Sequence, residues 1–317
     1  MRILITGGNG YVGRELTRLL YGAHEVCVAD ALRYGKNRFT ENECARFRFE
    51  KIDITSSAQV SSLVSDFKPE TIIHLAAIHY IPECENNPAL TAETNVQGTI
   101  NLLLAAPARS RFVFASSGAV YMPDGVPHQE ANAAIQPSDV YGLSKLHGEQ
   151  WVRYLARERR LSSVVVRLFN VVGPGETNPH LVPELVAQLK AGRLTIRLGN
   201  LSPKRDYIHV QDAARGFMAT ALNHELAPEE TVTVNLGTSH PYSVAEIVRK
   251  LRRIAGVKFS LEQDRERVRA VDRPYLAADN ALIKRVFGWV PLHTIDEALT
   301  DLWREPDLTD ALMAKYR

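Results

Sequence analysis

The feature that most constrains the fold is a regular alternation of short apolar runs with longer amphipathic stretches in the first half of the chain. The apolar runs have the length and β-branched content of strands, and they are Ile3–Thr6, Val26–Ala29, Phe47–Ile52, Thr71–Leu75, Arg111–Ala115 and Ser163–Phe169. Helix-length patterns lie between them, at Tyr11–Leu20, Ser56–Phe67, Ala89–Ala106 and Val140–Arg159. Strands that alternate with helices predict a parallel sheet with right-handed crossovers. Strands that are apolar on both faces predict helices on both sides. The expected fold class is therefore α/β, with a doubly wound parallel sheet.

The second half of the chain loses this rhythm. Gly173-Pro174-Gly175 and Pro179 interrupt the pattern, and the later elements are shorter and more mixed. We therefore expect a first domain over residues 1–170 and a smaller α/β domain built mainly from residues 171–317. Strand-like runs at Tyr207–Val210 and Val232–Leu236 predict that the chain returns to the first domain near residues 205–240.

Length, charge and cysteine content exclude several classes of protein. The chain has 317 residues and a net charge of +2, which is too small to indicate nucleic acid or a membrane surface as a partner. No apolar run approaches the roughly 20 residues of a membrane span, and the strand-like start at Arg2 leaves no room for a signal peptide. The three cysteines have no metal-ligand spacing, so no metal is expected. A reducing cytoplasm is the expected location.

A glycine-rich turn follows the first expected strand and opens the first expected helix. Its sequence is Gly7-Gly8-Asn9-Gly10-Tyr11-Val12-Gly13. Glycine at positions 7, 10 and 13 lets the backbone turn sharply and approach a pyrophosphate without a Cβ in the way. The helix N-terminus behind the turn favours the phosphates. This context predicts a dinucleotide site.

Two acidic residues at strand ends refine that prediction. Asp30 closes the second strand, where a carboxylate accepts both ribose hydroxyls and repels a 2′-phosphate. NAD is therefore favoured over NADP. Asp53 and Ile54 end the third strand, where an adenine contact is expected. The alternative for Asp53 is a capping aspartate before Thr55.

A candidate catalytic set combines the fifth strand with the helix at residues 140–159. Tyr141 and Lys145 are four residues apart and share one helix face. A nearby ammonium and an oxidised nicotinamide would both lower the tyrosine pKa, which makes the phenol a usable base. Ser117 ends the strand at the edge where open α/β sheets bind ligands, so its hydroxyl can orient a reacting oxygen toward Tyr141. Taken alone, the Tyr141–Lys145 pair is more typical of a surface helix, and Ser117 as the third member favours the catalytic interpretation.

Together these residues resemble the extended short-chain dehydrogenase/reductase superfamily, and within it the NAD-dependent nucleotide-sugar epimerases and dehydratases. The resemblance covers essentially the whole chain and includes His74-Leu75-Ala76-Ala77, Asn95 and Arg167-Leu168-Phe169-Asn170. It implies a Rossmann-like sheet with Leu75, Ala76 and Ala77 beside the dinucleotide and Asn95 supporting the site from a helix. It also implies that Tyr141 and Lys145 contact the cofactor. His74 is interpreted as a core histidine.

The resemblance also assigns a set of residues to a nucleotide diphosphate sugar. Asn170 matches an asparagine that contacts the sugar diphosphate, and His180 and Leu181 belong to a segment that lies against the base. Arg205 and Arg269 match two basic clamps, for which the planar guanidinium is well suited because it pairs two phosphate oxygens at once. Asp272 is expected to bind a ribose hydroxyl. Each arginine considered alone is more typical of a surface ion pair, and their occurrence together in the family order favours the clamp interpretation.

One departure from the family pattern narrows the set of reactions that the site can catalyse. Family dehydratases carry a glutamate at the position of Ala119, and without that carboxyl 4,6-elimination lacks its usual acid and base. Epimerisation at C4 through a transient 4-keto sugar is therefore expected. A 4,6-dehydratase, a 4-keto-sugar reductase, a sterol-type dehydrogenase and a catalytically idle dinucleotide-binding relative remain alternatives. The nucleotide (UDP, GDP, CDP or dTDP) stays open. Cys84, where relatives place serine, is interpreted as a small buried residue.

A homodimer is also implied by the resemblance. Family members pair the helices that correspond to residues 89–106 and 140–159. Leu102, Leu103, Trp151 and Leu155 are apolar positions on these helices that serve either the interface or the core.

Overall fold

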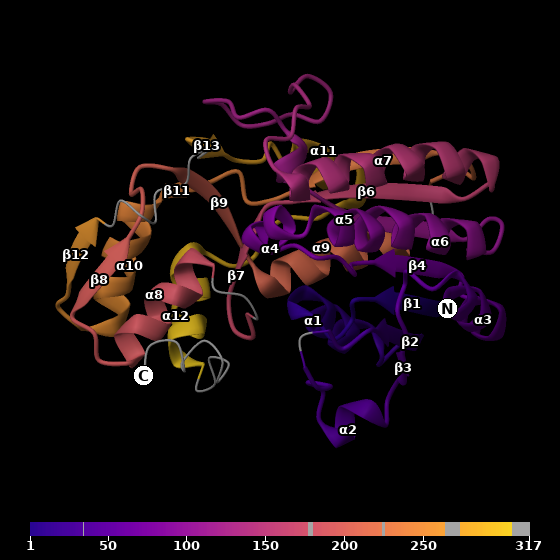
Figure 1. Ribbon diagram of the computed structural model, residues 1–317, viewed down its shortest axis with the longest axis horizontal. Coiled ribbons are helices and arrows are strands. Elements are labelled where there is room, and N and C mark those ends of the chain that lie inside the picture. The colour runs from indigo at the N-terminus through magenta and orange to yellow at the C-terminus, as the bar shows by residue number, and fades with distance from the viewer. Residues whose placement is uncertain (34, 177–179, 224–225, 264–272, 306–317) are drawn as a thin grey trace.

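The computed structural model describes residues 1–33, 35–176, 180–223, 226–263 and 273–305. Seven parallel strands form the main sheet in the order β10-β6-β5-β4-β1-β2-β3 (Figure 1). Their bounds are β1 Arg2–Thr6, β2 Glu25–Asp30, β3 Arg48–Lys51, β4 Thr71–His74, β5 Arg111–Ser117, β6 Ser162–Leu168 and β10 Thr231–Leu236. The order reverses between β1 and β4, as in a doubly wound sheet. The predicted α/β class is confirmed.

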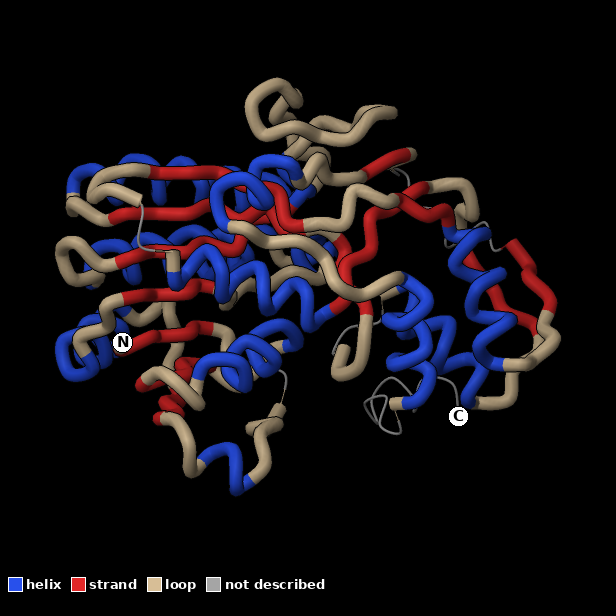
Figure 2. Tube along the Cα trace, turned by 180° about the vertical axis from the view of Figure 1, so that it is seen from behind, coloured by secondary structure: helices blue, strands red, loops and turns tan. Residues whose placement is uncertain are grey.

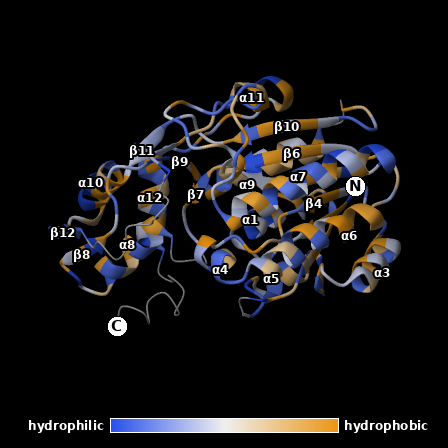
Figure 3. Cartoon of the chain, turned by 45° about the horizontal axis from the view of Figure 1, so that its top comes forward, coloured by the Kyte–Doolittle hydropathy of each residue, from blue (hydrophilic) through white to orange (hydrophobic). Residues whose placement is uncertain are grey.

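Helices cover both faces of this sheet because its strands alternate buried side chains between two cores. Ile3 and Ile5 of β1 face one core, which also takes up Leu16 and Phe217. Leu4 faces the opposite core. Helices α1 Tyr11–Leu20 and α9 Val210–Leu222 cover the first face. Helices α3 Ser57–Phe67, α6 Gly98–Ala105 and α7 Val140–Glu158 cover the second. The apolar colouring of the strands and of the inner helix faces follows this division (Figure 3).

The region predicted as helical at Ala89–Ala106 is helical throughout but not α-helical at every residue. Helix α5 Pro88–Ala92 passes into a π-helical turn, Glu93–Gln97, and continues as α6. The helical prediction is confirmed, and the π-helical turn within it was not predicted. Single π turns cluster at functional sites because they rotate one side chain out of the regular α-helical position. Here the turn contains Asn95.

A smaller unit lies at the carboxyl edge of the main sheet (Figure 2). Its central strand β9 Lys204–His209 pairs with β7 Asn170–Val172, β11 Pro241–Ser243 and β13 Tyr275–Leu276. A separate pair joins β8 Thr195–Leu198 to β12 Ser260–Gln263. Helices α8 Leu181–Lys190, α10 Val244–Ala255 and α12 Ile295–Arg304 enclose the apolar core of this unit.

The two strands expected to return to the first domain behave differently. β10 extends the main sheet next to β6, as expected for Val232–Leu236. The strand at Tyr207–Val210 does not extend the main sheet, because within the described part of the chain β9 pairs with strands of the smaller unit alone. Instead, the helix that follows it, α9, packs back against the main sheet. Short helices α2 Glu41–Cys44, α4 Ile81–Asn86 and α11 Ala281–Phe287 and a 3₁₀ turn at Gly118–Val120 complete the described elements. Within the described ranges, no helix has the length and apolar character needed to span a membrane.

Candidate active site

A large cavity of about 1470 Å³ lies at the carboxyl edge of the main sheet and is lined by both units. Open α/β sheets bind ligands at this edge, where the strand order reverses. The volume exceeds the roughly 300–1,000 Å³ of a pocket for one drug-sized ligand. The cavity therefore has room for more than one nucleotide-sized molecule.

The predicted glycine turn forms the floor of this cavity and requires glycine for steric reasons. Gly7 has a φ of 71°, and a Cβ on it would lie 2.6 Å from the backbone nitrogen of Ala76. A Cβ on Gly13 would lie 2.3 Å from the carbonyl oxygen of Gly7. Gly10 is the N-cap of α1 and provides no capping side chain. Together with Tyr11 and Val12 these residues line the cavity, so the backbone is open to a phosphate group.

The acidic residues of strands β2 and β3 reach the same cavity. The Asp30 carboxylate accepts hydrogen bonds from the backbone nitrogens of Asn9 at 3.1 Å and Leu32 at 2.8 Å. Burial raises its pKa, and these two bonds act in the opposite direction. Asp53 and Ile54 also line the cavity, and Asp53 accepts a hydrogen bond from the Thr55 nitrogen at 2.9 Å. The capping interaction expected as the alternative for Asp53 is thus present as well.

The segment after β4 is held in place from behind. Leu75, Ala76 and Ala77 line the cavity, whereas Asn95 is buried and is not part of the wall. The Asn95 side chain accepts a hydrogen bond from the Ile78 nitrogen at 2.8 Å and donates to the Ile78 carbonyl at 2.9 Å. It also donates to the Ser144 hydroxyl at 2.9 Å, so it joins this loop to α7.

His74 is a core histidine, as predicted. Its ring nitrogens are hydrogen-bonded to the hydroxyls of Thr6 at 2.7 Å and Thr99 at 2.9 Å. Burial lowers its pKa to about 3, so the ring is neutral.

Ser117, Tyr141 and Lys145 come together at the centre of the cavity. Ser117 ends β5 and lies beside Tyr141, near the start of α7, where its hydroxyl lowers the pKa of the phenol. The Lys145 Nζ lies one turn further along, 5.8 Å from the centroid of the Tyr141 ring. Helix α7 approaches β5 this closely because Gly142 has no side chain, and a Cβ there would lie 2.5 Å from the carbonyl oxygen of Ala119.

Burial controls the charge states of this pair. It raises the pKa of Tyr141 well above 10, against the lowering effect of the Ser117 hydrogen bond. In the protein alone the loss of solvation outweighs the polar neighbours of Tyr141. The expected lowering of its pKa involves an oxidised nicotinamide beside the phenol, so it stays a prediction for the NAD-bound protein. Burial also lowers the pKa of Lys145 to about 8. An ammonium at Lys145 is thus held in an environment that disfavours it.

A buried polar network behind the catalytic set was not predicted. Glu149 of α7 forms a paired ion contact with Arg167 of β6, at 2.9 and 2.7 Å, and accepts a hydrogen bond from Ser116 at 2.5 Å. The Arg167 guanidinium stacks over Tyr121, whose hydroxyl donates to Asn235 at 2.7 Å. These contacts fix α7 against three neighbouring strands. Arg167 belongs to a motif that resembles the family, and Glu149 carries no signal in the sequence.

The residues predicted for the second ligand lie mainly on the smaller unit. Asn170, His180, Leu181 and Arg205 line the cavity. Arg205 also donates to the carbonyl of Arg273 at 2.6 Å. Arg269 and Asp272 lie outside the described residues.

Arg273 was not predicted and ties the smaller unit to the catalytic helix. It is buried and donates to the Ala119 carbonyl at 2.9 Å and to the Asp139 carboxylate at 2.8 Å. Asp139 is the N-cap of α7 and accepts a hydrogen bond from the Gly142 nitrogen at 2.7 Å. The sequence offered one signal for Arg273, which is its position close to Arg269.

The two departures from the family pattern have simple structural consequences. Ala119 is buried on the cavity wall, so no carboxyl projects into the cavity from that position. Cys84 is fully buried, and its thiol donates to the Ile78 carbonyl at 3.5 Å. The interpretation of Cys84 as a small buried residue is confirmed.

A parallel dinucleotide-type sheet with a serine, a tyrosine and a lysine at its carboxyl edge, extended by a second unit, defines the extended short-chain dehydrogenase/reductase class. Residues 3–237 match the NAD dependent epimerase/dehydratase family. The chain therefore belongs to this family.

Known relatives match almost the whole chain. A UDP-glucose 4-epimerase from Erwinia amylovora is 30% identical over 96% of this chain and 97% of its own. A dTDP-glucose 4,6-dehydratase from Escherichia coli is 29% identical over 95% and 92%. A UDP-glucose-4-epimerase from Stenotrophomonas maltophila, solved with NAD and formylated UDP-arabinopyranose, is 26% identical, has a TM-score of 0.86 and covers 96% of this chain and 97% of its own.

Proposed function

We propose that the protein is an NAD-dependent 4-epimerase of a UDP-sugar, which acts through a transient 4-keto intermediate. The observation that carries this proposal is the position of Ser117, Tyr141 and Lys145 in a cavity of about 1470 Å³ with Ala119 in place of a carboxyl. Such a site can move one proton and one hydride at a carbinol carbon, but it has no acid at that position for elimination. The named epimerase relatives support UDP as the nucleotide.

The cavity residues fit NAD. A Cβ at Gly7 or Gly13 would fill the space along the turn, so the backbone there is shaped for close approach of a diphosphate. Asp30 presents a carboxylate to the same cavity, where two ribose hydroxyls can donate to it. In this proposal residues 1–170 hold NAD, and residues 171–317 mainly hold the nucleotide sugar. When bound, NAD supplies the acceptor and then the donor of a hydride.

The protein residues handle the proton and the geometry. Tyr141 takes the proton of the C4 hydroxyl and later returns it to the oxygen. Ser117 lies beside Tyr141 on the cavity wall and donates a hydrogen bond to the same substrate oxygen as it becomes a carbonyl. Lys145 places a positive charge on the helix face of Tyr141 and favours its phenolate. Asn170 and Arg205 hold the diphosphate while the sugar turns its other face.

A 4,6-dehydratase is the second candidate, because a dehydratase is among the relatives. Ala119 argues against it, since elimination needs an acid and a base near C5 and C6 of the sugar. A reductase would consume reduced cofactor in equal amounts with its product. A redox-neutral epimerase does not.

We also propose that the protein is a cytoplasmic homodimer. The three cysteines are free thiols, which a reducing compartment maintains. Leu102, Leu103 and Leu155 are buried in the core of the first unit, whereas Trp151 is 39% exposed. Tyr154 on the same helix is 55% exposed, and its ring lies 6.3 Å from that of Trp151. This aromatic pair supports a contact between copies through α7.

The first test identifies both ligands. The purified protein is denatured and the released small molecules are analysed by mass spectrometry, and the intact protein is then incubated with UDP-, GDP-, CDP- and dTDP-sugars. Released NAD and a UDP-sugar product of unchanged mass are expected. A product lighter by one water would replace the proposal with a dehydratase. A product heavier by two hydrogens, formed only with added NAD(P)H, would replace it with a reductase.

The second test removes the proposed base. Tyr141→Phe is expected to retain NAD and to lower kcat by at least about a hundredfold, because proton transfer by a positioned side chain contributes roughly 10²–10⁴. Tyr154→Phe, an exposed tyrosine on the same helix, is the matched control and should keep the normal rate. A Tyr141→Phe protein with near-normal kcat would show that Tyr141 is not the base.

A further inference from the structure

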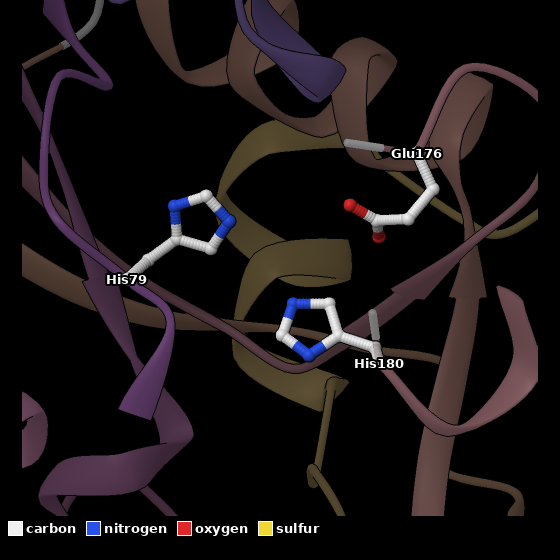
Figure 4. A group of neighbouring side chains, drawn as sticks. All are labelled: His79, Glu176 and His180. Atoms are coloured by element: carbon white, nitrogen blue, oxygen red, sulfur yellow. The ribbon is translucent and has the colours of Figure 1, made fainter. Parts of the chain in front are cut away.

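Two histidines and a glutamate face one another on the cavity wall, on the side of the smaller unit (Figure 4). The potential ligand atoms of His79, Glu176 and His180 all lie within 4.8 Å of one another. His79 follows β4 in the first unit. Glu176 and His180 precede α8 in the second. No sequence motif links these positions, and the group exists only because the fold brings the two segments together.

We propose that His79, Glu176 and His180 bind a divalent transition-metal ion of the Zn²⁺ type. Two imidazoles and one carboxylate are the ligand set of Zn²⁺ sites that keep a coordination position open. Ligand bonds of about 2.0–2.2 Å place neighbouring donor atoms of a tetrahedral ion about 3.4 Å apart. From a separation within 4.8 Å, side-chain movements of roughly 1 Å bring all three donors onto one ion.

The surroundings of the three side chains favour coordination. Glu176 is only 5% exposed, and a buried carboxylate is stable when it is paired or bound to a cation. His180 is the N-cap of α8, but its side chain does not bond the helix backbone, and its ring faces the His79 ring at a centroid distance of 6.0 Å. One ring nitrogen of each histidine points toward the space in front of the Glu176 carboxylate (Figure 4).

The open position of the ion would face the cavity that also contains Tyr141 and Asn170. Oxygen atoms of a nucleoside diphosphate or of a sugar can complete the coordination. This role of the metal rests on the proposed function, whereas metal binding itself does not. His180, expected from the resemblance to lie against the nucleotide, would then contact the substrate through the ion.

The binding test uses the untagged full-length protein, freed of metal with a chelator that is then removed. Equilibrium dialysis with Zn²⁺ alone is expected to give one ion per chain. His79→Ala, His180→Ala and Glu176→Gln should each weaken Zn²⁺ binding by at least about tenfold. His240→Ala removes an exposed histidine outside the cavity and should bind Zn²⁺ normally.

A check on folding keeps this result interpretable. Each variant is tested for a cooperative thermal transition, and Glu176→Gln, which keeps the shape of the side chain, is the decisive variant if either alanine variant is unstable. Failure to bind one Zn²⁺, or equal binding by wild type and Glu176→Gln, overturns the metal site. Because no sugar is present, this outcome leaves the proposed epimerase activity standing.

The role of the open position is tested with Co²⁺ as a spectroscopic probe in place of Zn²⁺. Addition of UDP is expected to change the visible spectrum of the Co²⁺ protein, because a phosphate oxygen enters the coordination shell. An unchanged spectrum together with normal epimerase turnover overturns the contact with substrate. A changed spectrum without turnover on any sugar keeps the contact and instead contradicts the proposed reaction.

Discussion

At the scale of single residues, the site contains a buried ammonium group, that of Lys145, in an environment that disfavours its charge. Lys145 is 3% exposed, and its Nζ lies over the rings of Phe114, at 5.2 Å, and Tyr141, at 5.8 Å. These rings partly replace water around the ammonium. The lowered pKa of about 8 shows that the replacement is incomplete. Catalytic lysines are often kept in such environments at the expense of folding stability.

The first residue-scale prediction follows from this pKa. A shift from 10.5 to about 8 corresponds to about 3 kcal/mol against the folded state at neutral pH. Lys145→Met in the NAD-free protein should therefore be more stable to urea at pH 7 than wild type, by up to that amount. Between about pH 8 and 10 the unfolded chain binds the proton and the folded chain does not, so the free energy of unfolding of wild type rises with pH. The difference in free energy of unfolding between Lys145→Met and wild type therefore narrows over this range.

The control for this prediction is Lys258→Met, which changes an exposed lysine. Its free energy of unfolding should stay within about 0.5 kcal/mol of the wild-type value at pH 7 and at about pH 10. A Lys145→Met protein that is less stable than wild type at pH 7 would mean that the ammonium is stabilised in the folded state.

Residue patterns predicted which side chains line the cavity better than they predicted the charge states of those side chains. The glycine turn, Asp30 and Ser117 line the cavity because each stands at the end of a strand, and Tyr141 and Lys145 line it from one face of α7. The burial that raises the pKa of Tyr141 in the protein alone was not predicted, since burial depends on what packs around a side chain. His79 and Glu176 were missed because only the fold brings them together.

At the scale of elements, the π turn at Glu93–Gln97 is the feature that positions the site. The extra residue in the turn points Asn95 away from solvent and toward the backbone of Ile78 and the hydroxyl of Ser144. Ser144 precedes Lys145 on α7, and Ile78 follows the segment that lines the cavity. Asn95 is therefore a positioning residue.

The element-scale prediction concerns Asn95→Ala. The substitution removes three hydrogen bonds and leaves the buried Ile78 nitrogen without its partner, so it should cost roughly 3 kcal/mol in the free energy of unfolding. It should also lower kcat more than it raises KM, because Asn95 does not line the cavity. Urea unfolding and steady-state kinetics measure the two effects. Asn132→Ala changes an exposed asparagine and should alter neither. Equal losses in the two variants would exclude a positioning role.

Element prediction from the sequence succeeded where local pattern decides the outcome. The bounds of α1 are those predicted, because glycine at its start and an apolar stripe along it are local signals. The π turn was missed, since the interaction that favours it reaches from Asn95 to a distant loop. The sheet partners of β9 were missed for the same reason, because a strand pattern does not specify which strands pair with it.

At the scale of the whole molecule, the cavity depends on how the two units are held together. Arg273 joins the second unit to Ala119 and Asp139 of the first, and Tyr11 of the glycine turn donates to the Gly173 carbonyl at 2.8 Å. Both contacts lie at the cavity wall. Ligands that touch both units should therefore strengthen this interface by mass action.

The last prediction concerns association of two copies. Trp151 and Tyr154 form an exposed aromatic pair on α7, and Leu104, 49% exposed, lies on the adjacent helix α6. Aromatic side chains are enriched in the buried centres of protein interfaces, and a charge placed there is costly because it loses its hydration. The wild-type protein should therefore have the mass of a dimer in light scattering at micromolar concentration, and Trp151→Glu should shift it to a monomer. Leu292→Glu places the same charge on a 63% exposed leucine outside α6 and α7 and should remain dimeric. A monomeric wild type would assign the exposed pair to the surface of a single chain, and a dimer that persists in Trp151→Glu would place the interface elsewhere.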